Sequence, residues 1–309
     1  MKESVVKEID IRTIDGFKLG NAEYEKSGCT VVLAKDGAVT GVDIRGGAPA
    51  SRESGLLNPL AANDGVHAVI LSGGSAFGLD TASGAMKYLE ERGIGFPAGG
   101  FYVPIVCTSC LFDLPVIGST RRPDAQLGYE ACANAEKGIF QTGKHGAGKG
   151  ATIGKVLGET YVHESGLGTC ALAIGDLKVG AVAAVNALGN VINKDGTILA
   201  GMKDPKTNEW IDAEEALYTA ASDLSEGQNT TIGIVITNAF FSKTACTKIA
   251  GLAHDGYARA IRPVHTMFDG DSIYVMSHGT QKADINVVGT LAAEAMERAI
   301  RNALKEEQL

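Results

Sequence analysis

Two adjacent threonines, Thr230 and Thr231, begin an apolar, β-branched run in "QNTTIGIVIT" (228–237). Threonine has a high strand propensity, so the pair alone is typical of an ordinary strand end. A threonine hydroxyl within a chain is a weak nucleophile unless a base lies beside it. A threonine at a chain N-terminus carries that base, because its own α-amine, with a pKa of about 8, adjoins the hydroxyl.

This chemistry requires that the peptide bond before the threonine be cut. The chain can cut it without help if the threonine hydroxyl attacks the preceding carbonyl and the resulting ester is hydrolysed. A flexible loop that ends at the first residue of a strand favours this geometry, and Gly227 lies just before Asn229 and Thr230. The sequence therefore makes Asn229–Thr230 a candidate self-cleavage site and Thr230 a candidate nucleophile that needs no histidine.

Motifs for other kinds of chemistry are incomplete. The stretch "GKHGAGKG" (143–150) has the spacing of a phosphate-binding loop, but Gly150 replaces the hydroxyl residue that would bind magnesium. The histidines form no H-x-x-x-H pattern, and Cys107 and Cys110 have no second pair with which to bind zinc. We therefore expect neither a metal nor a cofactor.

The stretch "SGGSAFGL" (72–79) reads as a strand that runs into glycines and then into a helix. Such a junction directs backbone N–H groups toward whatever lies at the helix N-terminus. It is equally typical of a plain strand-to-helix turn. As a substrate-binding site it would use Ser72, Gly73, Gly74, Ser75 and Phe77.

Hydrophobic periodicity predicts alternating strands and helices. We expect strands at 29–34, 38–46, 67–74, 104–114, 228–237 and 271–279, and a hairpin of 168–175 with 177–189. We expect helices at 75–93, 122–138, 212–225, 242–261 and 284–307. Several strands are apolar on both faces, which indicates two packed sheets covered by helices. A single doubly wound sheet is the competing layout.

Composition limits the class of protein. The 309 residues are 45% hydrophobic with a formal charge of −8 and a pI near 5.3, as in a soluble globular protein. Basic residues are scattered, so we expect no nucleic-acid partner. The N-terminus has no apolar core, so we expect no signal peptide and no membrane association. Six cysteines in mostly apolar text fit a reducing compartment, and we expect a cytoplasmic protein.

Five stretches occur in an order that resembles one enzyme family: "SGGSAFGLDTASG", "PIVCTSCLFDL", "VGAVAAVNALGNV", "NTTIGIVITNA" and "HTMFDGDSIY". They look like the L-aminopeptidase/D-esterase family of self-processing N-terminal-nucleophile hydrolases, which includes β-peptidyl aminopeptidases and nylon-oligomer hydrolases. The match covers roughly residues 28–280. It implies an α/β (α+β) fold arranged as a four-layer αββα sandwich. It also implies one domain, 1–309, cut into residues 1–229 (α subunit) and 230–309 (β subunit), and a homotetramer of processed protomers.

The resemblance also implies roles for individual residues. Thr230 would be the nucleophile, and its acidic partners would be Asp269 and Asp271 of "FDGD", where many relatives have Ser and Glu. Thr with two Asp is closer to the nylon-oligomer hydrolases. Asn186 matches the asparagine of the oxyanion hole, and Lys155 matches a site lysine of the nylon-oligomer branch.

Alternatives to these roles remain open at this stage. The Asp-Gly-Asp stretch is also typical of a turn that caps a strand. Asn190 and Asn193 are rival amides for the oxyanion, and Lys155 is equally compatible with a solvated surface charge.

Three functions compete. The favoured one is a hydrolase that releases N-terminal residues from small peptides, amides or esters through an acyl-Thr230 intermediate. The second is an acyltransferase similar to the ornithine acetyltransferases. The third is a small-molecule binding protein that keeps the fold and is not cleaved. The "SGGSAFGL" and "FDGD" motifs favour the hydrolase.

Overall fold

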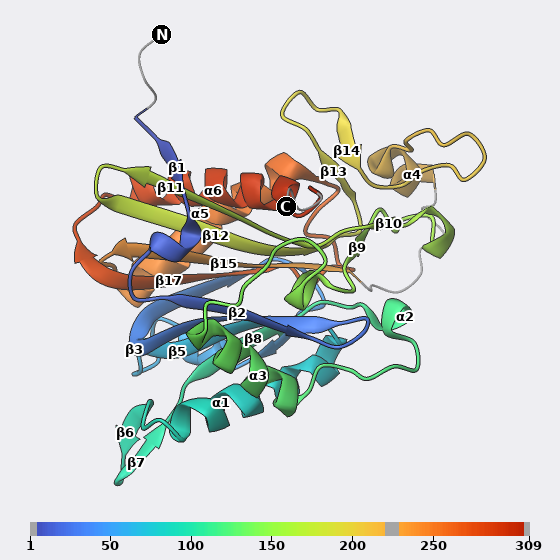
Figure 1. Cartoon of the computed structure of the whole chain (residues 1–309). Coiled ribbons are helices and arrows are strands. Elements are labelled where there is room, and N and C mark those ends of the chain that lie inside the picture. Colours follow the sequence, from blue (N-terminus) through green and yellow to red (C-terminus); the bar gives the residue numbers. More distant parts are fainter. Residues whose placement is uncertain (1–4, 220–228, 306–309) are drawn as a thin grey trace.

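A computed structural model describes residues 5–219 and 229–305 and places them in four layers (Figure 1). Helices α5 (Lys243–Ala260) and α6 (Ile285–Asn302) form one outer layer. Helices α1 (Thr81–Glu90) and α3 (Ala125–Glu136) form the other. Two layers of strands lie between them, so the predicted αββα sandwich is confirmed.

Strand β3 (Gly28–Ile44) joins the two strand layers. Its second half pairs with β17 in the layer under α5 and α6, and its first half pairs with β2 and β5 in the other layer. The first layer contains β1 (Lys7–Ile9), β11 (Leu167–Ile174), β12 (Leu177–Asn186), β15 (Thr230–Ala239) and β17 (Ser272–Gln281). The second contains β2 (Lys18–Glu23), β4 (Ala50–Arg52), β5 (Gly65–Ser72) and β8 (Val106–Cys110).

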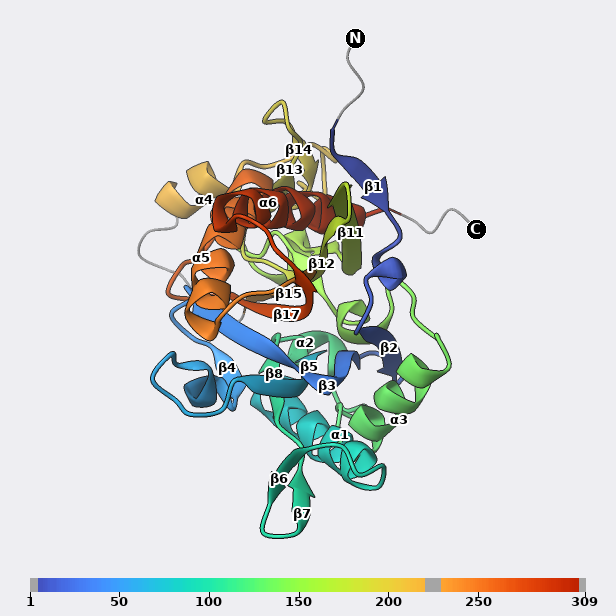
Figure 2. The same ribbon diagram turned by 90° about the vertical axis from the view of Figure 1, so that its left-hand side faces the viewer.

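Smaller elements lie around this sandwich. The hairpin of β6 (Phe96–Ala98) and β7 (Phe101–Val103) projects beyond α1, as Figures 1 and 2 show. The remaining strands are β9 (Thr152–Ile153), β10 (His163–Glu164), β13 (Asn190–Ile192), β14 (Ile198–Ala200) and β16 (Ile261–Arg262). The short helices are α2 (Leu114–Ile117) and α4 (Ala213–Thr219). The 3₁₀ turns are η1 (Ile11–Thr13), η2 (Ser54–Leu57), η3 (Ser75–Asp80), η4 (Gly146–Gly148) and η5 (Glu159–Tyr161).

Alternation along the strands accounts for the layers, because successive side chains point to opposite faces. On β15, Ile232, Ile234 and Ile236 lie in the core between the strand layers. Val235 lies instead in the core under α5 and α6. A central strand of this sandwich is therefore apolar on both faces, as the sequence indicates.

The predicted hairpin is confirmed, and side chains cap three of the helices. Strands β11 and β12 pair in antiparallel register around Gly175, which has a positive φ of 57°. Asp124, Ser242 and Asp284 each accept a backbone N–H at the start of α3, α5 and α6.

Some predicted boundaries were wrong. The predicted helix 75–93 begins only at Thr81, because Gly74 and Ser75 take left-handed backbone angles (φ 84° and 53°) and η3 follows. The strand predicted at 104–114 spans only 106–110, since α2 begins at Leu114. The strands predicted at 29–34 and 38–46 are one strand, β3, whose pairing with β5 shifts register between Leu33 and Ala38.

Parts of other predicted elements lie outside the described residues. Helix α4 ends at Thr219 and α6 at Asn302, and the predicted segments 220–225 and 306–307 belong to the parts not described. The same holds for Gln228, the predicted first residue of the strand that begins at Thr230. Within 5–219 and 229–305, no helix has both the length and the apolarity needed to cross a membrane.

Candidate active site

The site forms where β15 begins, between β12 and β17. Thr230, the first residue of β15, lies directly opposite Asn186, the last residue of β12. One residue earlier, Asn229 forms a parallel bridge with Asp269, in the segment that leads into β17. Sheet register therefore brings together three segments that the sequence singles out separately.

Thr230 is buried, with 4% of its surface exposed. Its hydroxyl contacts the carbonyl oxygen of Asn229, the residue before it. The backbone N–H of Asn229 donates to the carbonyl of Phe268 (3.2 Å), and its carbonyl oxygen accepts the N–H of Gly270 (3.1 Å). The segment before β17 thus binds both the backbone N–H and the carbonyl of Asn229.

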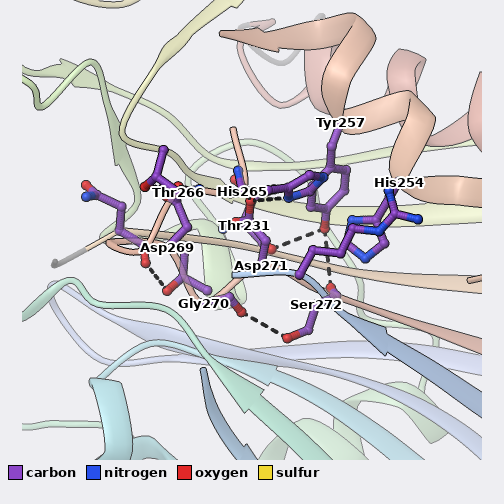
Figure 3. Close-up of polar contacts among 12 residues, drawn as sticks. Thr231, His254, Tyr257, His265, Thr266, Asp269, Gly270, Asp271 and Ser272 are labelled. Carbon is purple, nitrogen blue, oxygen red and sulfur yellow. Dashed lines mark hydrogen bonds and ion pairs between the residues drawn. The ribbon is translucent and has the colours of Figure 1, made fainter. Parts of the chain in front are cut away.

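Asp271 is buried and bound by three N–H donors. One carboxylate oxygen accepts the backbone N–H of Thr231 (2.7 Å). The other accepts both the backbone N–H (3.1 Å) and the ring Nδ1 (2.8 Å) of His265. Figure 3 shows Asp271 close to Thr231 and His265. Asp271 therefore fixes the backbone directly after the predicted nucleophile.

Asp269 is also buried, but its carboxylate has different neighbours. It accepts the backbone N–H (2.8 Å) and the hydroxyl (2.7 Å) of Thr266. Burial, reinforced by the nearby charge of Asp271, raises the pKa of Asp269 to about 6. Asp269 can therefore exchange a proton within one or two units of neutral pH.

Asn186 and Lys155 form a polar pair beside Thr230. The Nζ of Lys155 donates to the side-chain oxygen (2.7 Å) and to the backbone carbonyl (3.2 Å) of Asn186. The side-chain nitrogen of Asn186 donates to the carbonyl of Phe112 (2.9 Å). Burial lowers the pKa of Lys155 to about 7, against the opposing charges of Asp269 and Asp113. The structure therefore places Lys155 against Asn186 and not as a solvated surface charge.

The rival amides lie elsewhere. The side-chain nitrogen of Asn190 donates to the carbonyl of Ile211 (2.7 Å), and that of Asn193 to the hydroxyl of Thr197 (3.0 Å). Of the three candidate asparagines, the structure brings only Asn186 opposite Thr230.

Sequence reasoning missed an aromatic group behind Asp271. The ring of His265 stacks on that of Tyr257, with centroids 5.7 Å apart. The ring of His254 packs against the His265 ring edge to face, with centroids 4.7 Å apart. The hydroxyl of Tyr257 donates to the carbonyl of Thr231 (3.2 Å). Figure 3 shows these rings on the α5 side of the site. The sequence feature that could have indicated this group is His265, a few residues before the Asp-Gly-Asp stretch. A search for metal-binding histidine motifs does not select it.

The predicted substrate-binding residues lie around a second missed residue, Asp113. Ser72 ends β5, Gly73 and Gly74 form the turn, and Ser75 and Phe77 belong to η3. The backbone N–H of Gly74 donates to the Asp113 carboxylate (2.6 Å), so this donor already has an internal acceptor. Phe77 is 58% exposed under the guanidinium of Arg122. Their role in substrate binding stays a prediction.

A cavity of about 240 Å³ adjoins the site on the Asn229 side. Its walls are mostly apolar: Phe112, Pro115, Val116, Val156, Val162, Leu188 and Phe268. Its polar side chains are Asp113, Thr152, Lys155, Glu159 and Asn229. None of the residues of the "SGGSAF" turn lines it. The cavity is thus an apolar chamber with ionisable groups, one residue from the predicted nucleophile.

This arrangement suits acyl transfer, because a hydroxyl, an amide and groups that titrate near neutral pH lie close together. Within residues 5–219 and 229–305, no cluster of three or more His, Cys, Asp or Glu side chains is placed to hold a metal ion. The residues that sequence reasoning selected at this point, Thr230, Asn186, Lys155, Asp269 and Asp271, do lie together.

Comparison with known proteins gives relatives along nearly the whole chain. An uncharacterized aminopeptidase of Mycobacterium tuberculosis is 38% identical over 299 residues, which cover 88% of this chain and 84% of the relative. A 6-aminohexanoate-oligomer endohydrolase of Agromyces is 30% identical over 309 residues, covering 94% and 84%.

Solved structures share the fold. The L-aminopeptidase D-Ala-esterase/amidase of Ochrobactrum anthropi, described as a variant of the Ntn hydrolase fold, superposes with a TM-score of 0.66 at 15% identity. A Burkholderia β-aminopeptidase superposes with a TM-score of 0.65 at 18% identity. Each comparison covers 94% of this chain and 84% of the other. The sequence pattern of peptidase family S58 matches residues 9–308, and the chain belongs to that family.

Proposed function

We propose that the chain is an N-terminal-nucleophile amidohydrolase that cuts itself between Asn229 and Thr230. It would then hydrolyse N-terminal residues from small peptides, amides or esters through an acyl-Thr230 intermediate. The observation that carries the proposal is the placement of Thr230: its hydroxyl contacts the carbonyl of the preceding residue and lies opposite Asn186.

Self-cleavage is the first reaction of this proposal. The hydroxyl oxygen of Thr230 attacks the carbonyl carbon of Asn229, and the hydroxyl proton passes through a base to the Thr230 nitrogen as the C–N bond breaks. Water then hydrolyses the ester and leaves a carboxylate on Asn229 and a free amine on Thr230. Lys155, with a pKa of about 7, suits the role of base. The products are residues 1–229 and 230–309 of one domain.

Substrate hydrolysis is the second reaction. The free α-amine of Thr230 serves as the base for its own hydroxyl. An amide has two N–H donors, and Asn186 gives one of them to Phe112, which leaves the other for the oxyanion of the substrate. The charged form of Asp269 would hold the Thr230 ammonium, while Asp271 fixes the backbone of Thr231.

The cavity indicates where the acyl part of a substrate lies. Asn229 is the acyl part of the self-cleavage reaction, and it lines the cavity. A substrate carbonyl that replaces the carbonyl of Asn229 places the released residue against the same apolar walls. The relatives named as aminopeptidase and as 6-aminohexanoate-oligomer endohydrolase support an amide substrate.

We also propose a cytoplasmic homotetramer of processed protomers. The hairpin β6–β7 supports an interface between protomers, because it projects from the sandwich (Figure 2) and carries exposed large apolar side chains. Phe96, Phe101 and Tyr102 are 45%, 71% and 51% exposed.

Intact mass under denaturing conditions tests the proposal. We expect wild type to give the fragments 1–229 and 230–309, and Thr230→Ala to give one uncut chain. Thr231→Val is the matched control: the buried Thr231 hydroxyl has no hydrogen-bond partner among the described residues, so this variant should still cut. An uncut wild type would leave Thr230 without its amine base and would refute the proposal.

A further inference from the structure

Self-cleavage needs a donor on the carbonyl oxygen that becomes negatively charged during the attack. Asn186 carries the amide predicted for the oxyanion, but its side-chain nitrogen donates to the carbonyl of Phe112 and not to that of Asn229. The donor that does contact the carbonyl oxygen of Asn229 is the backbone N–H of Gly270, at 3.1 Å.

We propose that the Gly270 N–H is the oxyanion donor of self-cleavage, and that Asn186 takes this role only in substrate hydrolysis. The inference rests on the proposed function, since it assigns a donor to its first step. When the Thr230 oxygen bonds to the Asn229 carbon, the C=O electrons move onto the carbonyl oxygen, and the Gly270 N–H stabilises that charge. When the C–N bond breaks, the C=O bond reforms as an ester.

Gly270 is held in place before the reaction. The hydroxyl of Ser272 donates to the carbonyl of Gly270 (2.9 Å), as Figure 3 shows. The N–H of Asp269 donates to the carbonyl of Thr266 (3.1 Å), and Asn229 pairs with Asp269 across the parallel bridge. Both Gly270 and Ser272 are buried. A fixed, buried donor stabilises charge without reorganisation, which is how oxyanion donors act.

The absence of a side chain at 270 keeps the nucleophile accessible. A Cβ at this position would lie 2.8 Å from the Thr230 hydroxyl oxygen and 3.0 Å from the carbonyl oxygen of Ala48. Both distances are shorter than ordinary van der Waals contact. Gly270 therefore brings its N–H to the scissile carbonyl and leaves the hydroxyl room to attack it.

Replacing one backbone amide with an ester tests this inference. Cell-free translation with glycolic acid at position 270 exchanges the N–H for an oxygen and adds no side chain. We expect self-cleavage to slow by roughly 10²- to 10³-fold, the usual effect of removing one oxyanion donor. The control is glycolic acid at Gly196, whose N–H donates to Asn193 across an equal 3.1 Å in a remote turn. It should cleave at the wild-type rate.

A Gly270 ester that cleaves as fast as wild type would overturn the inference and leave the proposed function intact. An uncut wild type would instead refute the proposed function. If the ester variant fails to fold, Ser272→Ala decides, because it removes the hydroxyl that holds the Gly270 carbonyl. It should slow cleavage relative to Ser277→Ala. Ser277 lies on β17, as Ser272 does, and its buried hydroxyl makes a comparable bond to the carbonyl of Ala239. Equal rates for these two variants would overturn the inference.

Discussion

Asp269 and Asp271 show how neighbouring residues of one type can differ chemically. Asp271 accepts N–H donors from Thr231 and His265, on two different segments of the chain. Asp269 is bound by Thr266, and burial raises its pKa to about 6. Asp271 therefore acts as an anchor for the strand end, whereas Asp269 is the carboxylate whose charge changes near neutral pH.

Lys155 should give self-cleavage its pH dependence. Because burial holds the pKa of Lys155 near 7, the amine is charged below that pH and becomes a neutral base above it. We expect the rate of self-cleavage to rise as pH increases through about 7 and then to level off. Gel densitometry of the uncut chain across this range measures it. Lys155→Met should cleave slowly and lose this rise, and the same rise in Lys155→Met would contradict the assignment.

At the scale of residues, the sequence predicted the side chains of the candidate site better than its backbone donors. Thr230, Asn186 and the two aspartates could be selected from motifs, and sheet register does bring them together. The Gly270 N–H could not be found in this way, because residue type does not say where a backbone donor points. For the same reason, no sequence pattern reveals that the "SGGSAF" turn directs the N–H of Gly74 to Asp113.

At the scale of elements, the segment between β16 and β17 is the site's main support. It supplies His265, Thr266, Asp269, Gly270 and Asp271 within a few residues. His265 adopts a left-handed backbone with φ of 60°, uncommon for a residue other than glycine, and this turn lets both its N–H and its ring bind Asp271.

Variants of His265 should separate the contribution of its ring N–H, which binds Asp271, from the contribution of its left-handed backbone. Asparagine tolerates a positive φ and offers a side-chain N–H, so His265→Asn should keep most of the self-cleavage rate. His265→Leu removes the donor to the carboxylate, worth about 1.5–3 kcal/mol, and should slow cleavage by roughly 10- to 100-fold. Time courses on denaturing gels give the rates.

A strain control completes this test. Asn208 has nearly the same backbone angle, φ 61°, and its side chain is exposed. Asn208→Leu introduces a comparable strain and should cleave as wild type. If His265→Leu cleaved as fast as His265→Asn, the ring donor would have no part in positioning Asp271.

Elements themselves were largely predictable, because apolar periodicity and caps mark them. What the sequence could not give is the continuity of β3, since its register shift between Leu33 and Ala38 resembles a break between two strands. The start of α1 was missed because the left-handed angle at Ser75 is set by the turn and not by helix propensity. Tertiary contacts decide both features.

At the scale of the whole molecule, the proposed cut divides the chain without dividing its core. Strand β15 of the smaller fragment pairs with β12 of the larger one, and β17 pairs with β3. Helices α5 and α6 pack on β11, β12 and β3. One apolar core combines Val179 and Val185 with Ile249 and Leu291, so neither fragment buries its apolar surface alone.

We therefore expect the two fragments to remain one particle after cleavage. In native size-exclusion chromatography, cleaved wild type should elute at the same volume as uncut Thr230→Ala. Native mass spectrometry should find equal numbers of the two fragments in each particle, four of each if the proposed tetramer forms. Guanidinium, which solvates apolar and peptide groups, should separate them in a single cooperative transition. A smaller fragment that eluted by itself from the native column would contradict this expectation, because it would mean that the bond at Asn229, and not the shared core, holds β15 between β12 and β17.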